Sequence, residues 1–161
     1  MEKLEAELQI ARAVRAILAA GLFLTALGAR PAHAVLGAGA ESVEADRSAL
    51  GGERSEVAHA GYTVESITTA AGIAVNEYVS GSGTVFAVSW RGARHPDLSL
   101  LLGPYFSEYQ TAASQPPARR RGLRIQTENV VVETGGHPGD LWGRAYLPGQ
   151  LPSGVGAEDI Q

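Results

Sequence analysis

Apolar and polar side chains alternate in two parts of the chain, which predicts two groups of β-strands. Residues 70–72 and 80–83 carry the small residues and glycines typical of turns between the strands of the first group. The last strand of that group is largely uncharged on both faces, which predicts a central strand covered on both sides, with Phe86, Val88 and Trp90 sharing one face. The predicted strands are residues 62–68, 74–79 and 84–90 in the first group and 123–127, 130–134 and 141–147 in the second.

Between the two groups lies a segment whose apolar side chains recur at the spacing of an α-helix. Pro96 and Asp97 suit its first turn, because the N–H that proline lacks would have no partner there and a carboxylate is favourable at the positive end of the helix dipole. Gly103 and Pro104 interrupt the stripe, so we expect a kink or two short helices. The stripe consists of Leu98, Leu101, Leu102, Tyr105, Phe106 and Tyr109.

The order of these elements is a β-meander, a helix and a second β-meander, which predicts an α+β fold with one main amphipathic helix packed on an antiparallel sheet. We expect a single domain over residues 61–161. Residues 35–60 are small and polar, and we expect there a flexible segment with a short helix over residues 42–50 and a loop over residues 51–61.

The first 34 residues have the features of a cleavable secretory signal. Residues 16–29, 14 in number, carry no charge, whereas a helix that spans a bilayer needs roughly 20 apolar residues. Ala32 and Ala34 supply the small side chains that signal peptidase accepts three positions and one position before the cut, so we expect the mature chain to start at Val35. The alternatives are an uncleaved N-terminal anchor and an ordinary buried helix.

The charge that precedes the apolar stretch is unusual for a secretory signal. Residues 1–15 carry three basic and three acidic side chains, which cancel, whereas a signal usually begins with net positive charge. We therefore hypothesise that translation starts at Val14, which would leave Arg15 as a positive charge directly before the apolar stretch.

Removal of 34 residues leaves 127 of the 161, a length that suits one domain. Four of the 13 Lys and Arg and three of the 17 Asp and Glu lie in the removed part, so the mature chain has 9 basic and 14 acidic side chains and a net charge of −5. An acidic surface disfavours nucleic acids and anionic membranes as partners. The sequence has no cysteine, which excludes disulfides, thiol catalysis and cysteine zinc sites. We expect no cofactor, and no stable membrane span after cleavage.

Several short segments, taken together in their order and spacing, match one known pattern. They are Glu77–Val79, Gly83–Trp90, Pro96–Leu98, Leu101–Gly103, Tyr105–Phe106, Gly135–His137, Gly143–Pro148 and Leu151–Val155. In these segments the chain resembles the DUF2844 family of exported bacterial proteins of unknown function. The resemblance covers the chain from about residue 41 to the end and implies export, but no activity and no site residues.

Three histidines of the mature chain are candidate metal ligands, but they lie far apart in the sequence and lack the spacing of known ligand motifs. They are His59, His95 and His137. Histidines in solvated loops are the alternative. Residues 135–139 form a predicted turn, in which two glycines let the backbone approach closely at His137. The sequence around Ser82 lacks the G-x-S-x-G motif of serine hydrolases, so a hairpin turn is the better interpretation there.

Two further groups of charged residues have a functional and a plainer interpretation. Glu65 and Glu77 fall on neighbouring predicted strands, and a glycosidase uses a pair of carboxylates as acid and base. Exposed carboxylates on strands are the commoner explanation. Arg119–Arg121 follows two prolines and is either a site for an acidic partner or a solvated linker.

The aromatic residues near the end of the chain form the most distinctive set. Because side chains alternate along a strand, Trp142, Arg144 and Tyr146 are expected to share one face. Aromatic and arginine side chains are common in interfaces and in sugar-binding faces, and we add Trp90 and His137 to this candidate binding surface. The alternative is a core face in which the arginine lies over an aromatic ring.

These observations favour a periplasmic or secreted protein that acts as a non-catalytic binding or interaction module for an unknown envelope protein or a small ligand. The alternatives are a small cell-envelope hydrolase with an unrecognised site and a structural accessory in the assembly of the cell surface. A deep pocket with convergent titratable side chains would favour the hydrolase.

Overall fold

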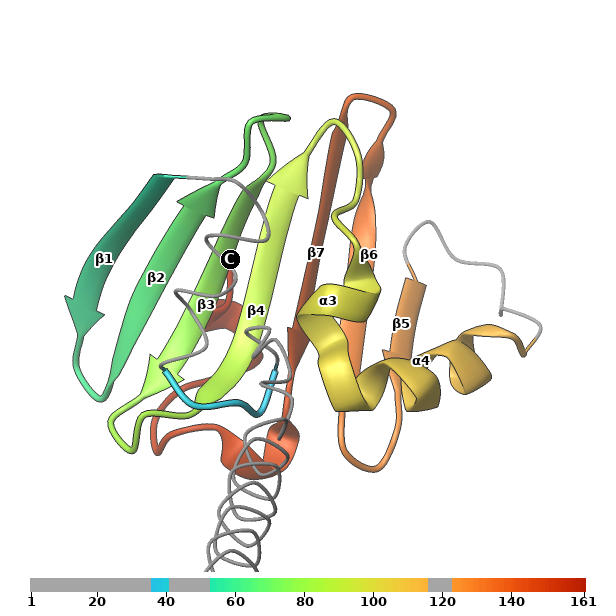
Figure 1. Ribbon diagram of the computed structural model, residues 1–161. Helices are drawn as coiled ribbons and strands as arrows, with labels where there is room; N and C mark the ends of the chain where they lie inside the picture. The colour runs from blue at the N-terminus through green and yellow to red at the C-terminus, as the bar shows by residue number, and fades with distance from the viewer. Residues whose placement is uncertain (1–35, 41–52, 116–122) are drawn as a thin grey trace, which may run out of the picture. The chain divides into compact units, whose positions relative to one another are not determined.

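The computed structural model of the chain describes residues 36–40, 53–115 and 123–161, and its strands form one antiparallel sheet (Figure 1). The sheet has seven strands in the order β1-β2-β3-β4-β7-β6-β5, so two meanders join where β4 pairs with β7. The strands are β1 (Glu53–His59), β2 (Tyr62–Thr68), β3 (Ala74–Ser80), β4 (Val85–Gly92), β5 (Leu123–Gln126), β6 (Val131–His137) and β7 (Asp140–Tyr146). The predicted antiparallel sheet with a helical segment is therefore correct in outline, although the fold is mostly β and its first meander has four strands rather than three.

The additional strand is β1, in a stretch that we predicted to be a loop. That prediction was wrong, because all seven residues of β1 pair with β2 across a two-residue turn in which Gly61 has a φ of +91°. Residues 54–59 are exposed, so neither face of this edge strand is marked by apolar residues. Without a buried face, alternation gave no signal.

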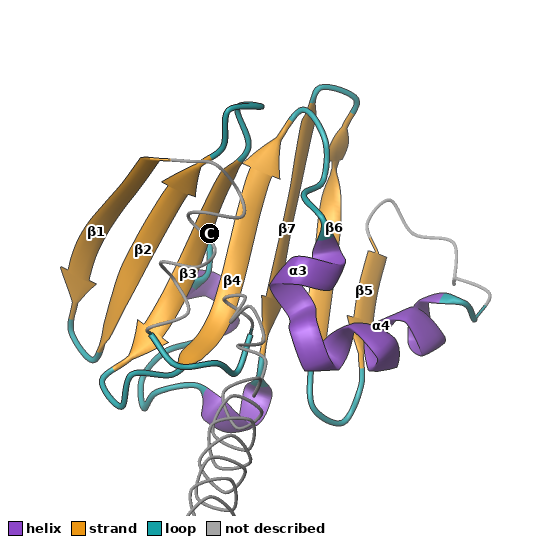
Figure 2. Ribbon diagram, viewed as in Figure 1, coloured by secondary structure: helices purple, strands orange, loops and turns teal. Residues whose placement is uncertain are grey.

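The helical segment lies against one face of the sheet, in front of β7, β6 and β5 in the view of Figure 2. It consists of α3 (Leu98–Leu102), a 3-10 turn η1 (Gly103–Tyr105) and α4 (Phe106–Ala113). Asp97 caps α3, since its carboxylate accepts a hydrogen bond from the backbone N–H of Ser99 at 2.9 Å. The predicted break at Gly103 and Pro104 is confirmed, because the two α-helices are separated at these residues.

Residues 85–90 of β4 are all buried, which confirms the prediction of a central strand covered on both sides. On the face that carries α3 and α4, here called the helix face, the buried cluster includes Val75, Val88, Trp90, Leu101 and Leu102. On the opposite face, here called the tail face, it includes Tyr78, Phe86, Val131, Tyr146 and Ile160.

A β-bulge changes the face on which one large side chain of β4 lies. Tyr78 pairs with Ala87 and the next residue, Val79, pairs with Val85, so Phe86 is an additional residue in β4. We predicted that Phe86 shares a face with Val88 and Trp90, and this was wrong because the bulge places it in the tail-face cluster.

The C-terminal tail, residues 148–161, contributes the apolar cover of the tail face. It contains two short 3-10 helices, η2 (Pro148–Gln150) and η3 (Ala157–Asp159). Ile160 is 1% exposed and packs in the tail-face cluster with Phe86 and Tyr146. The tail therefore covers apolar side chains of the tail face, as α3 and α4 cover those of the helix face.

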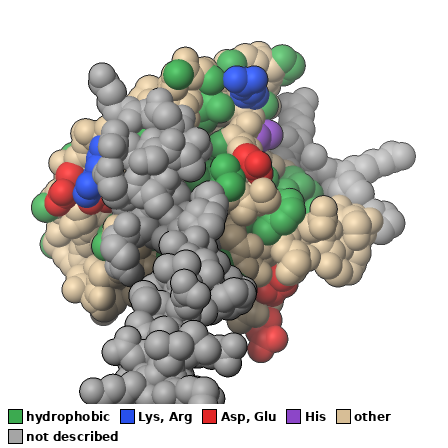
Figure 3. Space-filling view, in the orientation of Figure 1, with side chains coloured by type: hydrophobic (Ala, Val, Ile, Leu, Met, Phe, Trp, Pro, Cys, Tyr) green, Lys and Arg blue, Asp and Glu red, His purple; other side chains and the backbone are tan. Residues whose placement is uncertain are grey.

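Three predictions fall outside the described residues: the secretory signal over residues 1–34, the short helix over residues 42–50 and the linker at Arg119–Arg121. In the part of the chain that the structure describes, no helix is long and apolar enough to cross a membrane. On the face of the described residues that Figure 3 shows, acidic and basic side chains are scattered rather than gathered into one charged patch.

Candidate binding site on the tail face

The residues of the predicted binding surface do not all lie on one face. Trp142, Arg144 and Tyr146 of β7 do share the tail face, as their spacing predicts. Tyr146 is only 6% exposed and belongs to the tail-face cluster. His137 is exposed at the end of β6, directly opposite Asp140.

Trp90 is the member that does not join them. It is 2% exposed, belongs to the helix-face cluster and lies against Gly143 of the neighbouring strand. Its indole Nε1–H donates a hydrogen bond to Nδ1 of the exposed His95 at 2.9 Å. Grouping Trp90 with Trp142 was an error, since the alternation along each strand places the two indoles on opposite faces of the sheet. Trp90 has a structural role.

A hollow of about 360 Å³ opens on the tail face between β3, β4, β7 and the C-terminal tail. Its walls include Asn76, Ser89, Arg91, Trp142, Arg144 and Gln161. Small-ligand sites span roughly 300–1,000 Å³, so this hollow suits a small ligand.

Trp142 is the large apolar side chain at this hollow that remains open to solvent, with 41% of its surface exposed. Its indole lies against the backbone of Gly135 in β6. A Cβ atom at Gly135 would come within 2.7 Å of indole Cζ2 and 2.8 Å of Cε2, closer than real Cβ contacts allow. Glycine is therefore needed at position 135 for the ring to occupy this place.

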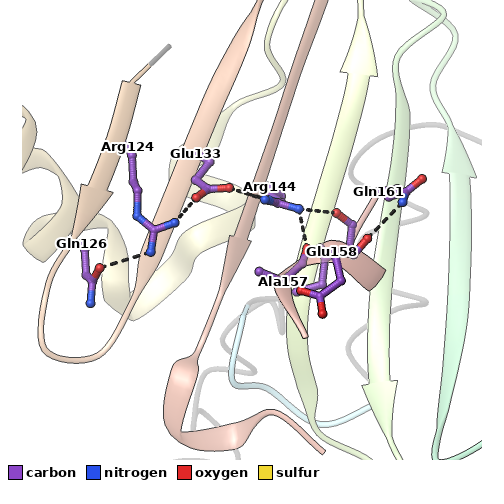
Figure 4. Close-up of polar contacts among 8 residues, drawn as sticks. Arg124, Gln126, Glu133, Arg144, Ala157, Glu158 and Gln161 are labelled. Atoms are coloured by element: carbon purple, nitrogen blue, oxygen red, sulfur yellow. Dashed lines mark hydrogen bonds and ion pairs between the residues drawn. The ribbon is translucent and has the colours of Figure 1, made fainter. Parts of the chain in front are cut away.

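One polar residue from each of the seven strands stands directly opposite the next across the sheet, and we call this line the polar row. It runs Ser55, Ser66, Asn76, Ser89, Arg144, Glu133 and Arg124. The Ser66 hydroxyl donates to Oδ1 of Asn76 at 2.8 Å. Glu133 accepts from Nε of Arg144 at 2.6 Å and also from Arg124 (Figure 4). The row fixes the arginine and the amide that border the hollow.

The C-terminal tail is joined to the middle of the polar row by hydrogen bonds. The carbonyl oxygen of Gln161 accepts from Nδ2 of Asn76 at 3.0 Å, from the Ser89 hydroxyl at 2.7 Å and from the Tyr78 hydroxyl at 2.7 Å. Arg144 donates to the carbonyl oxygens of Ala157 and Ile160 (Figure 4). These bonds hold the tail as one wall of the hollow.

A second ion pair stands at the rim, beyond Trp142. Arg91 donates from Nε to Oδ1 of Asp140 at 2.8 Å and from Nη2 to Oδ2 at 2.7 Å, the bidentate geometry that suits a guanidinium and a carboxylate. The hydrogen bond from Arg91 lowers the pKa of Asp140 below its ordinary value, and the charges of Arg91 and His137 act in the same direction. Asp140 is therefore ionised at neutral pH.

The carboxylate pair proposed for acid–base chemistry lies on the other face. Glu65 of β2 and Glu77 of β3 are directly opposite each other. Glu65 precedes Ser66 and Glu77 follows Asn76, and because side chains alternate along a strand, both carboxylates lie on the helix face. We considered them exposed, and this was wrong, because Glu65 is 6% and Glu77 0% exposed. Glu65 accepts two hydrogen bonds from Arg54, at 2.8 and 2.7 Å.

The remaining candidates stay apart in space or have a local role. His59 stacks on Tyr62 with ring centroids 4.9 Å apart, whereas His95 binds Trp90. Within the described ranges, no three His, Asp or Glu side chains are grouped so that they could hold a metal ion. Ser82 lies in the β3–β4 turn and shares a hydrogen bond of 2.8 Å with the Ser80 hydroxyl.

Sequence reasoning missed four polar residues of the hollow, namely Asn76, Ser89, Arg91 and Gln161. Asn76 and Ser89 had a usable signal, because each is a polar side chain inside a strand that is otherwise mostly buried. Gln161 had none, because its contribution is a backbone carbonyl.

Comparison with known proteins adds a family and no activity. The family model described as "Protein of unknown function (DUF2844)" matches residues 32–160. Neither the curated proteins nor the solved structures gave a match.

Proposed function

Because the chain belongs to the DUF2844 family, whose description names no activity, we propose its function from the site: an exported, non-catalytic module that binds a small ligand in the hollow beside Trp142. The observation that carries the proposal is the indole of Trp142, 41% exposed at the edge of a hollow of about 360 Å³. Its ring is held in place by Gly135, and its neighbours in the hollow are already oriented by hydrogen bonds. A prearranged aromatic surface with a few fixed polar groups is typical of small-ligand sites.

The chemistry of the walls supports binding over hydrolysis. A hydrolase needs a general base or acid within reach of its substrate, most often an imidazole or a carboxylate. Of the described residues that line the hollow, the side chains with hydrogen-bonding groups are arginine, tryptophan, serine, asparagine and glutamine. The buried carboxylates Glu65 and Glu77 face the opposite side of the sheet. Among the described residues, a hydrolase would have to draw its acid or base from outside the lining of the hollow, and Asp140 at the rim is committed to Arg91.

The proposal of export has its support in the sequence. The uncharged stretch 16–29 and the small residues Ala32 and Ala34 have the features of a signal that is cut before Val35. Expression of the full 161-residue sequence in a Gram-negative host, followed by cell fractionation and N-terminal sequencing, tests this. We expect a periplasmic or secreted chain that begins at Val35. A product that remains in the cytoplasm with an uncut N-terminus would refute export.

A separate preparation tests the translation start. We expect the intact precursor to begin with Met followed by Arg15 when the natural coding region is expressed from its own start. A precursor peptide that contains Glu2 to Glu7 would refute a start at Val14.

Binding in the hollow is tested by native mass spectrometry of the exported protein after incubation with a small-molecule extract of the cell envelope. We expect a mass increase that is lost in Trp142→Ala and kept in Arg94→Ala, a control in an exposed loop outside the hollow. An equal mass increase in Trp142→Ala would refute the site.

A further inference from the structure

The arginines at the hollow are each neutralised by a carboxylate. Arg91 makes two hydrogen bonds to Asp140, and Arg144 binds Glu133 at 2.6 Å. Within these two pairs, the side-chain charges of two guanidinium groups and two carboxylates sum to zero. An anionic ligand would have to compete with carboxylates that already occupy the best positions at both guanidinium groups. The hollow is therefore suited to a ligand that is polar and uncharged.

The Arg91–Asp140 pair presents donors and acceptors side by side in one plane. Its two internal hydrogen bonds use Nε and Nη2 of Arg91, so the N–H groups of Nη1 are not used within the pair. Each oxygen of Asp140 accepts one bond from Arg91 and has a second lone-pair direction. Two adjacent hydroxyl groups, each both donor and acceptor, match such a pair.

Trp142 supplies the complementary apolar contact. Its indole is supported on one side by the backbone of Gly135, so its orientation is fixed before any ligand arrives. A sugar ring has one face lined mainly by C–H groups, and a rigid aromatic ring offers that face a flat apolar surface at low entropic cost. The indole and the ion pair belong to adjacent positions of the tail face, because Trp142 is directly opposite Arg91.

We propose that the ligand of the hollow is an uncharged saccharide of one or two rings, which stacks on Trp142 and bonds through neighbouring hydroxyls to Arg91 and Asp140. This inference rests on the proposed function and adds the ligand class. The hollow of about 360 Å³ is at the low end of small-ligand sites, roughly 300–1,000 Å³, which sets the limit of two rings. The saccharide is either free in solution or a unit of an envelope polysaccharide, since both present the same ring chemistry.

Titration calorimetry of the exported protein tests the ligand class. The probes are four uncharged disaccharides, namely cellobiose, maltose, lactose and diacetylchitobiose, with digalacturonate as the acidic counterpart. We expect saturable binding of at least one uncharged disaccharide and none of digalacturonate. Co-sedimentation with insoluble cellulose and chitin then separates a polymer-bound unit from a free sugar. The proposal is overturned when none of the four uncharged disaccharides and neither polymer binds.

Variants at the site distinguish stacking and charge balance from general effects. Trp142→Ala is expected to weaken binding of the uncharged sugar at least tenfold, whereas Arg94→Ala leaves it unchanged. Asp140→Asn exposes the charge of Arg91, so we expect binding of digalacturonate to appear and to fall with added salt. Asp140→Asn is an exposed change that keeps the fold and serves as the independent test when Trp142→Ala is poorly folded. Unchanged sugar binding in both variants would overturn the proposal.

Failure of this inference is distinct from failure of the proposed function. A ligand of another class that is lost in Trp142→Ala overturns the saccharide and leaves the binding module standing. A ligand whose affinity is the same in wild type and Trp142→Ala overturns both.

Discussion

Replacing Gly143 by alanine tests whether the buried indole of Trp90 requires glycine on the neighbouring strand. The added Cβ would lie 2.2 Å from Cζ2, 2.4 Å from Cε2 and 2.9 Å from Nε1 of Trp90. Trp90 cannot retreat easily, because it is 2% exposed and its Nε1–H is bonded to His95. The methyl group must therefore displace either the ring or the backbone of β7.

The magnitude follows from three contributions. Overpacking of a core costs about 1–3 kcal/mol. Loss of the Trp90–His95 hydrogen bond leaves a buried donor without its partner, which costs about 1–3 kcal/mol. Against these, replacing glycine by alanine stabilises by about 0.4–1 kcal/mol through the unfolded chain. We expect Gly143→Ala to lower the free energy of unfolding by about 2–4 kcal/mol, a large share of the roughly 5–15 kcal/mol of a typical domain.

Urea unfolding followed by far-UV circular dichroism measures this change without relying on the altered indole. With a slope of about 1–3 kcal/mol per M, the midpoint should fall by about 1–2 M. The matched control is Gly149→Ala, because no heavy atom lies within 4 Å of a Cβ at that position, and its stability should stay within about 0.5 kcal/mol of wild type.

A double-mutant cycle with Trp90→Phe identifies the contact responsible. The phenyl ring lacks the three indole atoms that the methyl group would meet, so Gly143→Ala should cost at least about 1 kcal/mol less in the Trp90→Phe background. The reasoning is refuted if Gly143→Ala and Gly149→Ala are equally stable, or if the two changes in the cycle are additive.

Three further predictions concern the helix cap, the tail and the polar row. Asp97→Ala should destabilise the protein by about 0.5–2 kcal/mol in urea unfolding, and Asp97→Asn by less. Hydrogen bonds from Ser99 lower the pKa of the Asp97 carboxyl. The stability that Asp97 contributes is therefore present above its ordinary pKa of 3.8 and is lost as the pH falls through the lowered folded pKa, a loss that Asp97→Ala should not show. Ile160→Ala should cost about 2–4 kcal/mol by the same assay, because Ile160 is 1% exposed, and a cost below 1 kcal/mol would mean that the tail is not packed as described. Glu133→Ala should cost about 1–3 kcal/mol, since it removes the carboxylate partner of the half-buried Arg144, and a neutral result would show that the polar row does not stabilise the sheet.

The sequence predicted the strands that have one buried face or two, and it missed the strand whose two faces are both exposed. β2, β3 and β4 were found because burial imposes a pattern on them. β1 was missed because residues 54–59 are exposed, and pairing of exposed backbone leaves no mark on side-chain identity. The face of Phe86 was wrong because a single additional residue reverses alternation, and nothing in the composition of β4 marks the bulge.

The candidate site was predictable within a strand but not across strands. Period-two alternation was enough to place Trp142 and Arg144 together. It could not separate Trp90 from them, because which face of β4 matches which face of β7 depends on register, and register is set by pairing over the whole sheet. The contribution of Gln161 depends on a backbone carbonyl brought to Ser89 from 72 residues away, which no local pattern records.

Trp90 and Trp142 use the same local arrangement with opposite outcomes. Each indole lies against a glycine of the next strand, Gly143 for Trp90 and Gly135 for Trp142. On the helix face the first ring is covered, whereas on the tail face the C-terminal tail crosses beside the second and leaves it 41% exposed. Covering that surface would stabilise the fold by roughly 25 cal/mol per Å² of apolar area. An indole that the fold holds rigidly but does not cover forgoes that stabilisation, which is the physical reason to assign Trp142 to a ligand rather than to the core.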